Sequence, residues 1–249
     1  MSGERASVFA QRLASIEDEI AAACKRSGRR RDDISLMAVS KMHPSSVIRE
    51  AFAAGIRLFG ENRVQEFAQK STELVDLTTP GNRAAGDAPA FHLIGHLQSN
   101  KSAKAVDLFD AIDSVDSIRL AERLQESALA RGRRLPVLIE IKLSHEETKT
   151  GLDPSSHELQ YLLERMHSMP ALELRGLMTV PPYDEDAECA RPFFRQLREL
   201  RESLSQAHPH IQLNDLSMGM SGDFSVAIEE ESTVIRLGTA LFGERKYPR

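Results

Sequence analysis

A regular alternation of short, β-prone apolar runs with longer helical stretches is the feature that most constrains how this chain folds. The apolar runs predict strands at 34–40, 57–60, 91–95, 111–115, 136–143, 173–180, 212–217 and 233–237. The stretches that follow them predict helices near 44–54, 62–77, 99–107, 117–131, 155–168, 187–206 and 222–229. Several runs are almost continuously apolar, as in VLIEI at 137–141. Such runs are typical of parallel strands that helices cover on both faces.

This order of elements predicts an α/β fold, a single (β/α)8 TIM barrel with an extra N-terminal helix. An open doubly wound sheet is the alternative, because the pattern alone does not distinguish the two. The stretch Thr78–Ala90 is rich in Pro, Gly and Ala, and it is expected to be a mobile surface loop rather than a linker. Residues 1–249 are therefore expected to form one domain. Apolar residues at helical spacing, ending near Ser27-Gly28, indicate the extra helix: Phe9, Leu13, Ile16 and Ile20.

The composition argues against several classes of protein. Lys and Arg total 32 against 37 Asp and Glu, a net charge of −5, which does not favour a general nucleic-acid binder. Cys24 and Cys189 are too few for a disulfide framework or a four-cysteine zinc site, and we expect them to be reduced. No apolar run approaches the ~18 residues of a membrane span, and the N-terminus does not fit a signal peptide. We expect a cytoplasmic protein without a metal site.

Chemistry in a TIM barrel is found where its strands end, so polar residues at those positions are the candidates. Lys41 directly follows the apolar run at 36–40. A desolvated lysine has a lowered pKa and becomes a nucleophile that forms Schiff bases. A lysine that reaches out to solvent from the strand end is the ordinary alternative.

Two further strand ends carry polar candidates. Asn62 is either a ligand contact or the cap of the next helix. His96 is either a pocket residue or an ordinary surface histidine. His92 and His96 are four residues apart, but Gly95 interrupts any helix between them, which argues against a zinc-binding pair.

The ends of the last two strands indicate a phosphate site. The stretch LSMGMSGDF at 216–224 offers hydroxyls, Ser217 among them, and backbone N–H groups, although a capped Gly/Ser turn is the alternative. Arg236 and Gly238 have the same parity, so both can face the interior, where an arginine needs an anion or a strong acceptor. Barrels often bind phosphate after strands seven and eight, so Thr239 beside Gly238 completes the predicted site.

These candidates lie in motifs that resemble the pyridoxal-phosphate homeostasis proteins (the YggS-like family), which are related to the N-terminal barrel domain of alanine racemase. The resemblance covers nearly the whole chain, and the length and order of its motifs make it specific. The motifs are AVSK at 38–41, LFGENRVQE at 58–66, FHLIGHLQSNK at 91–101, RGLMT at 175–179, LSMGMSGD at 216–223 and IRLGTALFGER at 235–245.

The resemblance implies a barrel that binds pyridoxal 5′-phosphate as its cofactor. Lys41 would form the Schiff base, Arg236 would face the pyridine nitrogen, and Asn62 would lie near the ring. The remaining residues would hold the phosphate. The full implied set is Lys41, Asn62, Ser217, Met218, Gly219, Arg236, Gly238 and Thr239.

Two functions are compatible with this site. The first is a non-catalytic handler that binds, buffers and supplies pyridoxal phosphate to apo-enzymes, and the second is a pyridoxal-phosphate-dependent amino-acid racemase of low activity. A weaker third is a barrel enzyme without the cofactor, in which Lys41 forms a Schiff base with a sugar phosphate. Absorbance of the purified protein separates the third from the others.

Two features favour the handler. Arginine stays protonated and disfavours a second positive charge on the pyridine ring, so Arg236 would weaken the ring as an electron sink. In alanine racemase the second base is a tyrosine from a C-terminal domain, and the tyrosines here are Tyr161, Tyr183 and Tyr247. We therefore expect cofactor homeostasis without robust catalysis. No apolar stripe beyond the first helix demands a partner, so a monomer is expected.

Overall fold

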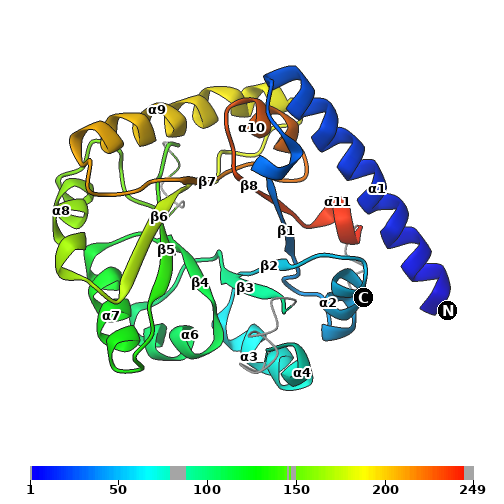
Figure 1. Ribbon diagram of the computed structural model, residues 1–249, viewed down its shortest axis with the longest axis horizontal. Coiled ribbons are helices and arrows are strands. Elements are labelled where there is room, and N and C mark those ends of the chain that lie inside the picture. Colours follow the sequence, from blue (N-terminus) through cyan, green and yellow to red (C-terminus); the bar gives the residue numbers. More distant parts are fainter. Residues whose placement is uncertain (1, 79–87, 145, 147–149, 244–249) are drawn as a thin grey trace.

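Eight parallel strands form a closed barrel in sequence order in the computed structural model, which describes residues 2–78, 88–144, 146 and 150–243 (Figure 1). The barrel closes because β1 pairs with both β2 and β8. This closure confirms the predicted (β/α)8 fold and excludes the open sheet. The strands are β1 (Ser35–Val39), β2 (Leu58–Glu61), β3 (Ala90–Leu93), β4 (Ala111–Val115), β5 (Leu135–Glu140), β6 (Leu172–Met178), β7 (Asp215–Ser217) and β8 (Val234–Leu237).

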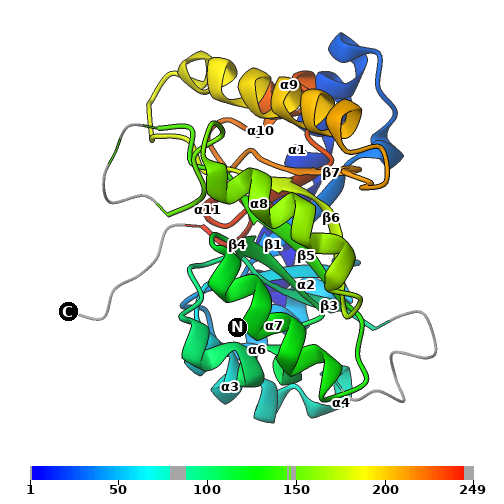
Figure 2. The same cartoon turned by 90° about the vertical axis from the view of Figure 1, so that its left-hand side faces the viewer.

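Helices surround the barrel on its outer side. Figure 2 shows α7, α8 and α9 lying one above the other along one side of it. The α-helices are α1 (Ser2–Ser27), α2 (Ser45–Ala53), α3 (Val64–Glu73), α4 (Val75–Thr78), α6 (Ser102–Leu108), α7 (Ile118–Leu129), α8 (His157–Arg165), α9 (Arg191–Ala207), α10 (Phe224–Glu229) and α11 (Thr239–Phe242). Short 3-10 helices are η1 (Arg31–Asp33), η2 (Ser99–Lys101), η3 (Met166–Ser168) and η4 (Ala187–Ala190).

The long α1 confirms the predicted extra helix. It ends at Ser27 and is followed by Gly28 in a left-handed conformation (φ 70°), which favours glycine. It packs outside the ring of strands against α10 and α11. In the described part of the chain, no helix has both the length and the apolar character needed to cross a membrane.

Three segments differ from the predicted elements. The helix expected at 62–77 is divided at Leu74, a fully buried residue that ends α3 before α4 begins. The strand expected at 212–217 is shorter, because only Asp215–Ser217 pair with neighbouring strands. Most of the predicted loop at 78–90 lies outside the described residues.

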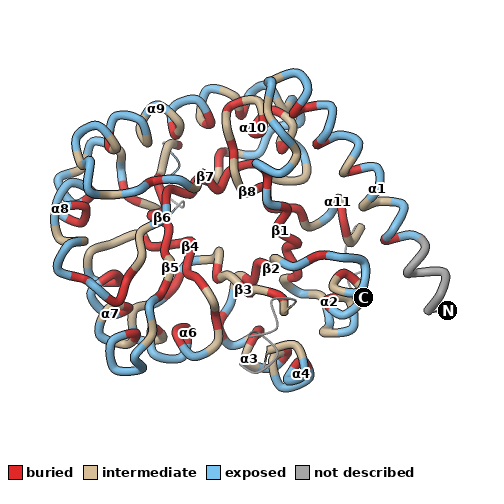
Figure 3. The backbone as a smooth tube through the Cα atoms, viewed as in Figure 1, coloured by how far each residue is buried: buried red, intermediate tan, exposed pale blue. Residues whose placement is uncertain are grey.

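Side chains alternate between the two faces of each strand, and this alternation positions the site. On β1, Leu36 and Ala38 pack in the apolar core shared with the helices, whereas Met37 and Val39 are buried but lie outside that core. The strands are the most buried part of the molecule, and the helices expose their outer sides (Figure 3). Side chains repeat every two residues along a strand, so the alternation of β1, carried on to Lys41 two residues past its end, predicts an inward-facing lysine.

Glycine allows close backbone approach at one neighbouring pair of strands. A Cβ atom added at Gly176 on β6 would lie 1.8 Å from the carbonyl oxygen of Asp215 on β7. No real side chain tolerates that distance, so the contact between these two strands requires glycine at this position.

We predict that Gly176→Ala lowers the free energy of unfolding by about 1–3 kcal/mol or more, because the methyl group must push β6 and β7 apart. Urea unfolding followed by circular dichroism measures this loss. Gly222→Ala is the control, since a Cβ there meets nothing within 4 Å, and it should change stability by about 0.5 kcal/mol at most. Equal stability of both variants would contradict the assigned contact.

Candidate functional site

The predicted site residues meet at one rim of the barrel. All the strands run parallel, so their C-terminal ends share that rim. Lys41 follows β1, Asn62 follows β2, and Gly238 follows β8. Register joins two of these ends directly, since Met37 pairs with Arg236 and Ala38 with Leu237. Residues from both ends of the sequence are therefore neighbours in space.

Lys41 is half-buried and lies in a tight turn between β1 and α2. The next residue, Met42, has a left-handed backbone (φ 63°), which is uncommon for a residue other than glycine. The backbone N–H of Ser40 donates to the carbonyl of Gly60, and that of His43 donates to Ser40. The turn is thus fixed to the rim from which Lys41 extends.

A buried ion-pair network holds the backbone on both sides of Lys41. The Nζ atom of Lys70 on α3 lies 2.8 Å from Oε1 of Glu61 and 2.7 Å from Oε1 of Glu66. It also donates to the carbonyl oxygen of Ser40 at 2.9 Å, while the Ser40 hydroxyl donates to Glu61 at 2.7 Å. On the far side, the backbone N–H of Met42 donates to Glu66.

The two glutamates of this network are shifted in opposite directions. Burial raises the pKa of Glu61, although Lys70 and the Ser40 hydroxyl favour its charged form. Burial acts in the same sense on Glu66, but hydrogen bonds from Lys70 and from the Met42 N–H hold the pKa of Glu66 below its ordinary value. A charged acceptor strengthens a hydrogen bond, so Glu66 anchors Met42 firmly.

Arg236 is buried inside the barrel, as its parity predicted. Its Nη1 atom donates to the carbonyl and hydroxyl oxygens of Ser217 at 2.6 and 2.7 Å, and Nη2 donates to the carbonyl of Thr179 at 2.7 Å. Burial lowers the pKa of Arg236, and the charges of Asp113, Asp223 and Glu140 oppose that shift. A guanidinium has five N–H donors, so donors remain for a ligand.

The ends of β7 and β8 are joined by hydrogen bonds around the predicted phosphate site. The Arg236 N–H donates to the carbonyl of Gly219 at 2.9 Å, and the Ala240 N–H donates to the Ser221 hydroxyl at 3.2 Å. Gly219 has a left-handed backbone (φ 95°). Gly238 and the exposed Thr239 begin the neighbouring turn.

Two of the predicted phosphate contacts have other partners in this structure. The N–H of Met218 donates to Val234, and its side chain packs in the apolar core. The Ser217 hydroxyl accepts from Arg236, although a hydroxyl can still donate its own proton. Phosphate binding by these two residues stays a prediction.

Asn62 presents an acceptor with no partner. Its Oδ1 atom is buried and has no hydrogen bond to any described residue. The backbone of Asn62 also lies close to Gly95, where an added Cβ would be 2.4 Å from the Asn62 carbonyl oxygen. A buried polar atom without a partner is costly, so this amide indicates a ligand contact.

The alternative interpretation, in which Asn62 caps the next helix, does not fit the structure. Arg63, not Asn62, precedes the first residue of α3, and the Arg63 side chain forms no cap hydrogen bond.

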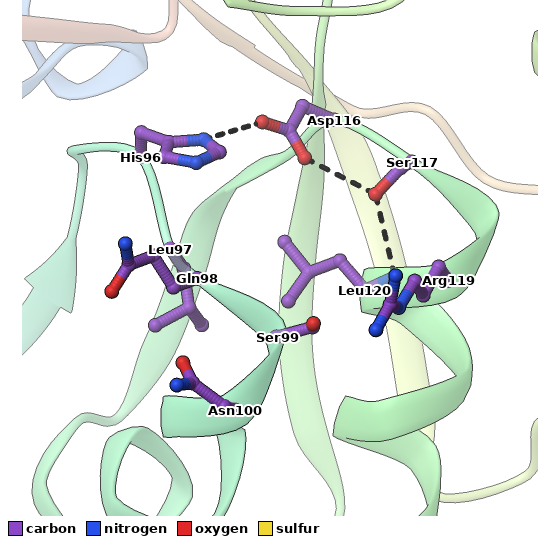
Figure 4. Close-up of a pocket in the computed structure, with 9 residues that line it drawn as sticks. All are labelled: His96, Leu97, Gln98, Ser99, Asn100, Asp116, Ser117, Arg119 and Leu120. Carbon is purple, nitrogen blue, oxygen red and sulfur yellow. Dashed lines mark hydrogen bonds and ion pairs between the residues drawn. The ribbon is translucent and has the colours of Figure 1, made fainter.

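His96 lines a surface pocket of about 420 Å³ on the same side of the barrel (Figure 4). Its Nδ1 atom lies 2.7 Å from Oδ2 of Asp116, which follows β4. Ser117 caps α7 by accepting from the Leu120 N–H at 3.3 Å. The pocket lies between η2 and the start of α7, and Lys41 and Arg236 do not line it. His96 is therefore a pocket residue. It also lines a second cavity, of about 240 Å³, together with Asn62, one of the predicted cofactor residues.

Sequence reasoning missed the network of Lys70, Glu61 and Glu66. Charged residues spaced three or four positions apart on a helix are typical of a solvated face, and α3 shows that pattern with Glu66, Lys70 and Glu73. The sequence feature that could have indicated the network is Glu61 at the end of an apolar strand, because a buried carboxylate there needs a cation as its partner.

The chain is similar to proteins of one known family. Residues 12–246 match the family described as "Alanine racemase, N-terminal domain". The chain is 43% identical over 237 residues to the pyridoxal phosphate homeostasis protein of Aquifex aeolicus, covering 95% of this chain and 98% of that protein. It is 40% identical over 243 residues to the protein of the same name from Escherichia coli K12, with 97% and 98% covered.

A solved structure shows the same likeness. PipY of Synechococcus elongatus PCC7942, solved with PLP bound, is 42% identical to this chain and superposes with a TM-score of 0.80. The match covers 94% of this chain and all of that one (100%).

We predict that Lys70→Met lowers the free energy of unfolding by about 3–5 kcal/mol, because it leaves the buried Glu61 carboxyl and the Ser40 carbonyl without their cation. Urea unfolding measures the loss. Lys104→Met, on the exposed side of α6, is the control and should stay within about 0.5 kcal/mol. Adding Glu61→Leu to Lys70→Met should recover much of the stability, and a double variant no more stable than Lys70→Met would count against the pairing.

Proposed function

Because this chain belongs to the alanine racemase N-terminal domain family and, within it, to the pyridoxal phosphate homeostasis proteins, we propose that it binds pyridoxal 5′-phosphate and takes part in the homeostasis of that cofactor. The observation that carries this proposal is the place of Lys41. It is a half-buried lysine in the turn that follows β1, at the rim where Arg236 and Gly238 arrive from β8.

The residues at the rim fit the chemical groups of pyridoxal phosphate. When bound, this cofactor supplies an aldehyde that reacts reversibly with a primary amine. Lys41 provides the amine, the backbone turn at Gly238-Thr239 and the Ser217 hydroxyl suit the phosphate, and Arg236 offers donors to a ring nitrogen. The Oδ1 atom of Asn62, which has no hydrogen bond to any described residue, supports the proposal because a ligand could supply a donor there.

The buried guanidinium of Arg236 favours binding over catalysis. It keeps its proton, so it disfavours a positive charge on a pyridine ring beside it and leaves that ring a weak electron sink. We propose that the chain works as one cofactor-binding domain over residues 1–249, as a cytoplasmic monomer that supplies apo-enzymes. A low-activity racemase is the alternative, and turnover of amino acids distinguishes it.

We predict that protein loaded with pyridoxal phosphate is yellow and that borohydride fixes the cofactor to Lys41. Lys41→Ala should lose the label while the circular dichroism spectrum stays unchanged, because the residue lies in a surface turn. Mass spectrometry of the peptides locates the label. A label on another lysine, with Lys41→Ala still yellow, would refute the assignment.

Thr239→Ala is the matched control for this experiment, because it tests the phosphate contact without touching the amine. It should keep the label at saturating cofactor but weaken affinity by about one to two decades, the cost of a charge-assisted hydrogen bond of roughly 1.5–3 kcal/mol. Titration of the apo-protein measures the affinity.

We predict that the loaded protein reactivates an apo-enzyme that depends on pyridoxal phosphate, yet shows little turnover of its own. Racemisation and transamination should be far slower than the usual range of about 1–10³ per second, because Arg236 weakens the electron sink. Incubation with L- and D-amino acids, followed by chiral analysis, measures turnover, and an equal amount of free cofactor is the control for delivery. Rapid turnover of one amino acid would establish the enzyme instead.

A further inference from the structure

A buried carboxyl in the barrel has an oxygen without a partner. Glu140 is the last residue of β5 and is 7% exposed. Its neighbours Val137 and Ile139 pack in the outer apolar core, whereas Leu138 does not, so Glu140 shares the inward face with Leu138. The Thr150 hydroxyl donates to Oε1 of Glu140 at 2.9 Å. Its Oε2 atom is buried and has no hydrogen bond to any described residue.

Glu140 lies on the wall of the barrel opposite Lys41. Three strands separate β1 from β5 in either direction around the closed barrel, and Figure 1 shows the two strands on opposite sides of the ring. Glu140 ends β5 and Lys41 follows the end of β1 by two residues, so both lie at the C-terminal rim of the barrel. A molecule held by Lys41 therefore has Glu140 across the barrel from its point of attachment.

Other carboxylates near the interior already have partners. Asp113 contacts Nδ1 of His92 at 3.1 Å, Asp116 contacts His96 at 2.7 Å, and Asp223 accepts from the Met220 N–H. An unpaired buried acceptor costs about 1–3 kcal/mol, more when it is charged. Among these acids, Glu140 is the one whose surroundings leave a place for a hydrogen-bond donor from outside the chain.

The surroundings of Glu140 make its carboxyl a weaker acid than that of an exposed glutamate. Burial raises the pKa of Glu140, and the charge of Asp116 acts in the same direction. The Thr150 hydroxyl, Arg236 and His96 oppose that shift. General acid–base catalysis is most effective when the pKa of the group lies near the operating pH.

We propose that Glu140 is the general base of an amine-acceptor site, where it takes a proton from a small primary ammonium ion that enters the barrel and so allows the cofactor to leave Lys41. The inference rests on the proposed function, since it requires a cofactor held by Lys41. The carboxylate both attracts the cation and provides the acceptor that its N–H groups need.

The exchange balances in protons and bonds. The incoming ammonium gives one proton to Glu140 and becomes a nucleophilic amine. A new carbon–nitrogen bond forms between this amine and the cofactor's aldehyde carbon, while the bond from that carbon to the Lys41 nitrogen breaks. The amine loses its second proton as the Lys41 nitrogen gains one, and Lys41 is restored. No oxidant or reductant is needed.

Two nucleophiles test the role of Glu140 in the loaded protein. Methylamine is protonated at neutral pH and needs a base before it can attack, whereas hydroxylamine is mostly unprotonated and does not. In Glu140→Gln, the ratio of the methylamine rate to the hydroxylamine rate should fall by about 10²-fold, the lower end of general-base contributions. Absorbance of the released products measures both rates. Glu173→Gln, at the N-terminal end of the barrel on β6, is the matched control and should keep the ratio of the unchanged protein.

A second measurement uses the apo-protein. With ¹³C-labelled glutamate, the carboxyl resonance that disappears in Glu140→Gln should titrate above the ordinary range for glutamate. Methylammonium should lower its midpoint, because a bound cation favours the charged form.

An unchanged ratio of the methylamine rate to the hydroxylamine rate in Glu140→Gln would overturn the proposal. A carboxyl resonance whose titration midpoint does not change when methylammonium is added would also overturn it. Failure of borohydride to fix the cofactor to Lys41 would instead reject the proposed function. In that case the titration of the apo-protein would still decide whether Glu140 binds an ammonium ion.

Discussion

The pairing of β1 with β8 is the constraint on which the site depends. Met37 is in register with Arg236, and a Cβ atom at Gly238 would lie 3.5 Å from the carbonyl oxygen of Val39. This single ladder brings Lys41 and the turn at Gly238-Thr239 to one rim, although Lys41 and Gly238 are 197 residues apart in the sequence. The entropic cost of closing so long a loop grows only slowly with its length, so one well-paired ladder can hold the two ends together. Any change that opens the ladder would separate Lys41 from the predicted phosphate site.

The network around Lys70 holds the backbone on both sides of the candidate lysine, Lys41. Buried ion pairs add little net stability, because desolvation of the charges offsets their attraction. Their geometry, however, is demanding. Lys70 contacts the Ser40 carbonyl while Glu66 accepts from the Met42 N–H, so the backbone is held on both sides of Lys41. An apolar replacement could fill the same volume, yet it would leave this turn free to move. The network therefore serves position more than stability, and it explains why charged residues lie behind a strand that is otherwise apolar.

The barrel, the place of Lys41 after a buried strand, the inward parity of Arg236, and the meeting of the last two strand ends could all be predicted from sequence, because they follow from alternation, side-chain period and parallel order. The partners of these residues could not. Lys70 lies nine residues after Glu61, a spacing that gives no sign of a contact between a helix and a strand end.

The sequence also gave little indication of Glu140. It lies within the apolar run VLIEI, where it is the one charged residue, at an inward position. His96 was a candidate, but its partner Asp116 comes from the next strand and depends on tertiary pairing. The pattern of apolar and polar residues predicts which face of a strand or helix a side chain lies on. Which side chains contact one another across different elements can be seen only in the folded structure.

A protein that buffers a reactive aldehyde must both hold it and give it up, and our two proposals place these tasks on opposite walls of the barrel. The wall of β1, β7 and β8 carries the amine, the hydroxyl of Ser217 and the turn at Gly238 that suit holding. The wall of β5 carries the Glu140 carboxyl. Arg236 connects the two, because its charge acts on Glu140 as well as on any ring beside it. The guanidinium favours the carboxylate form of Glu140, against the larger effect of burial, which raises the pKa of that carboxyl. The same charge disfavours the protonated ring that amino-acid chemistry would need. One buried cation thus favours exchange of the cofactor between amines over further chemistry on them.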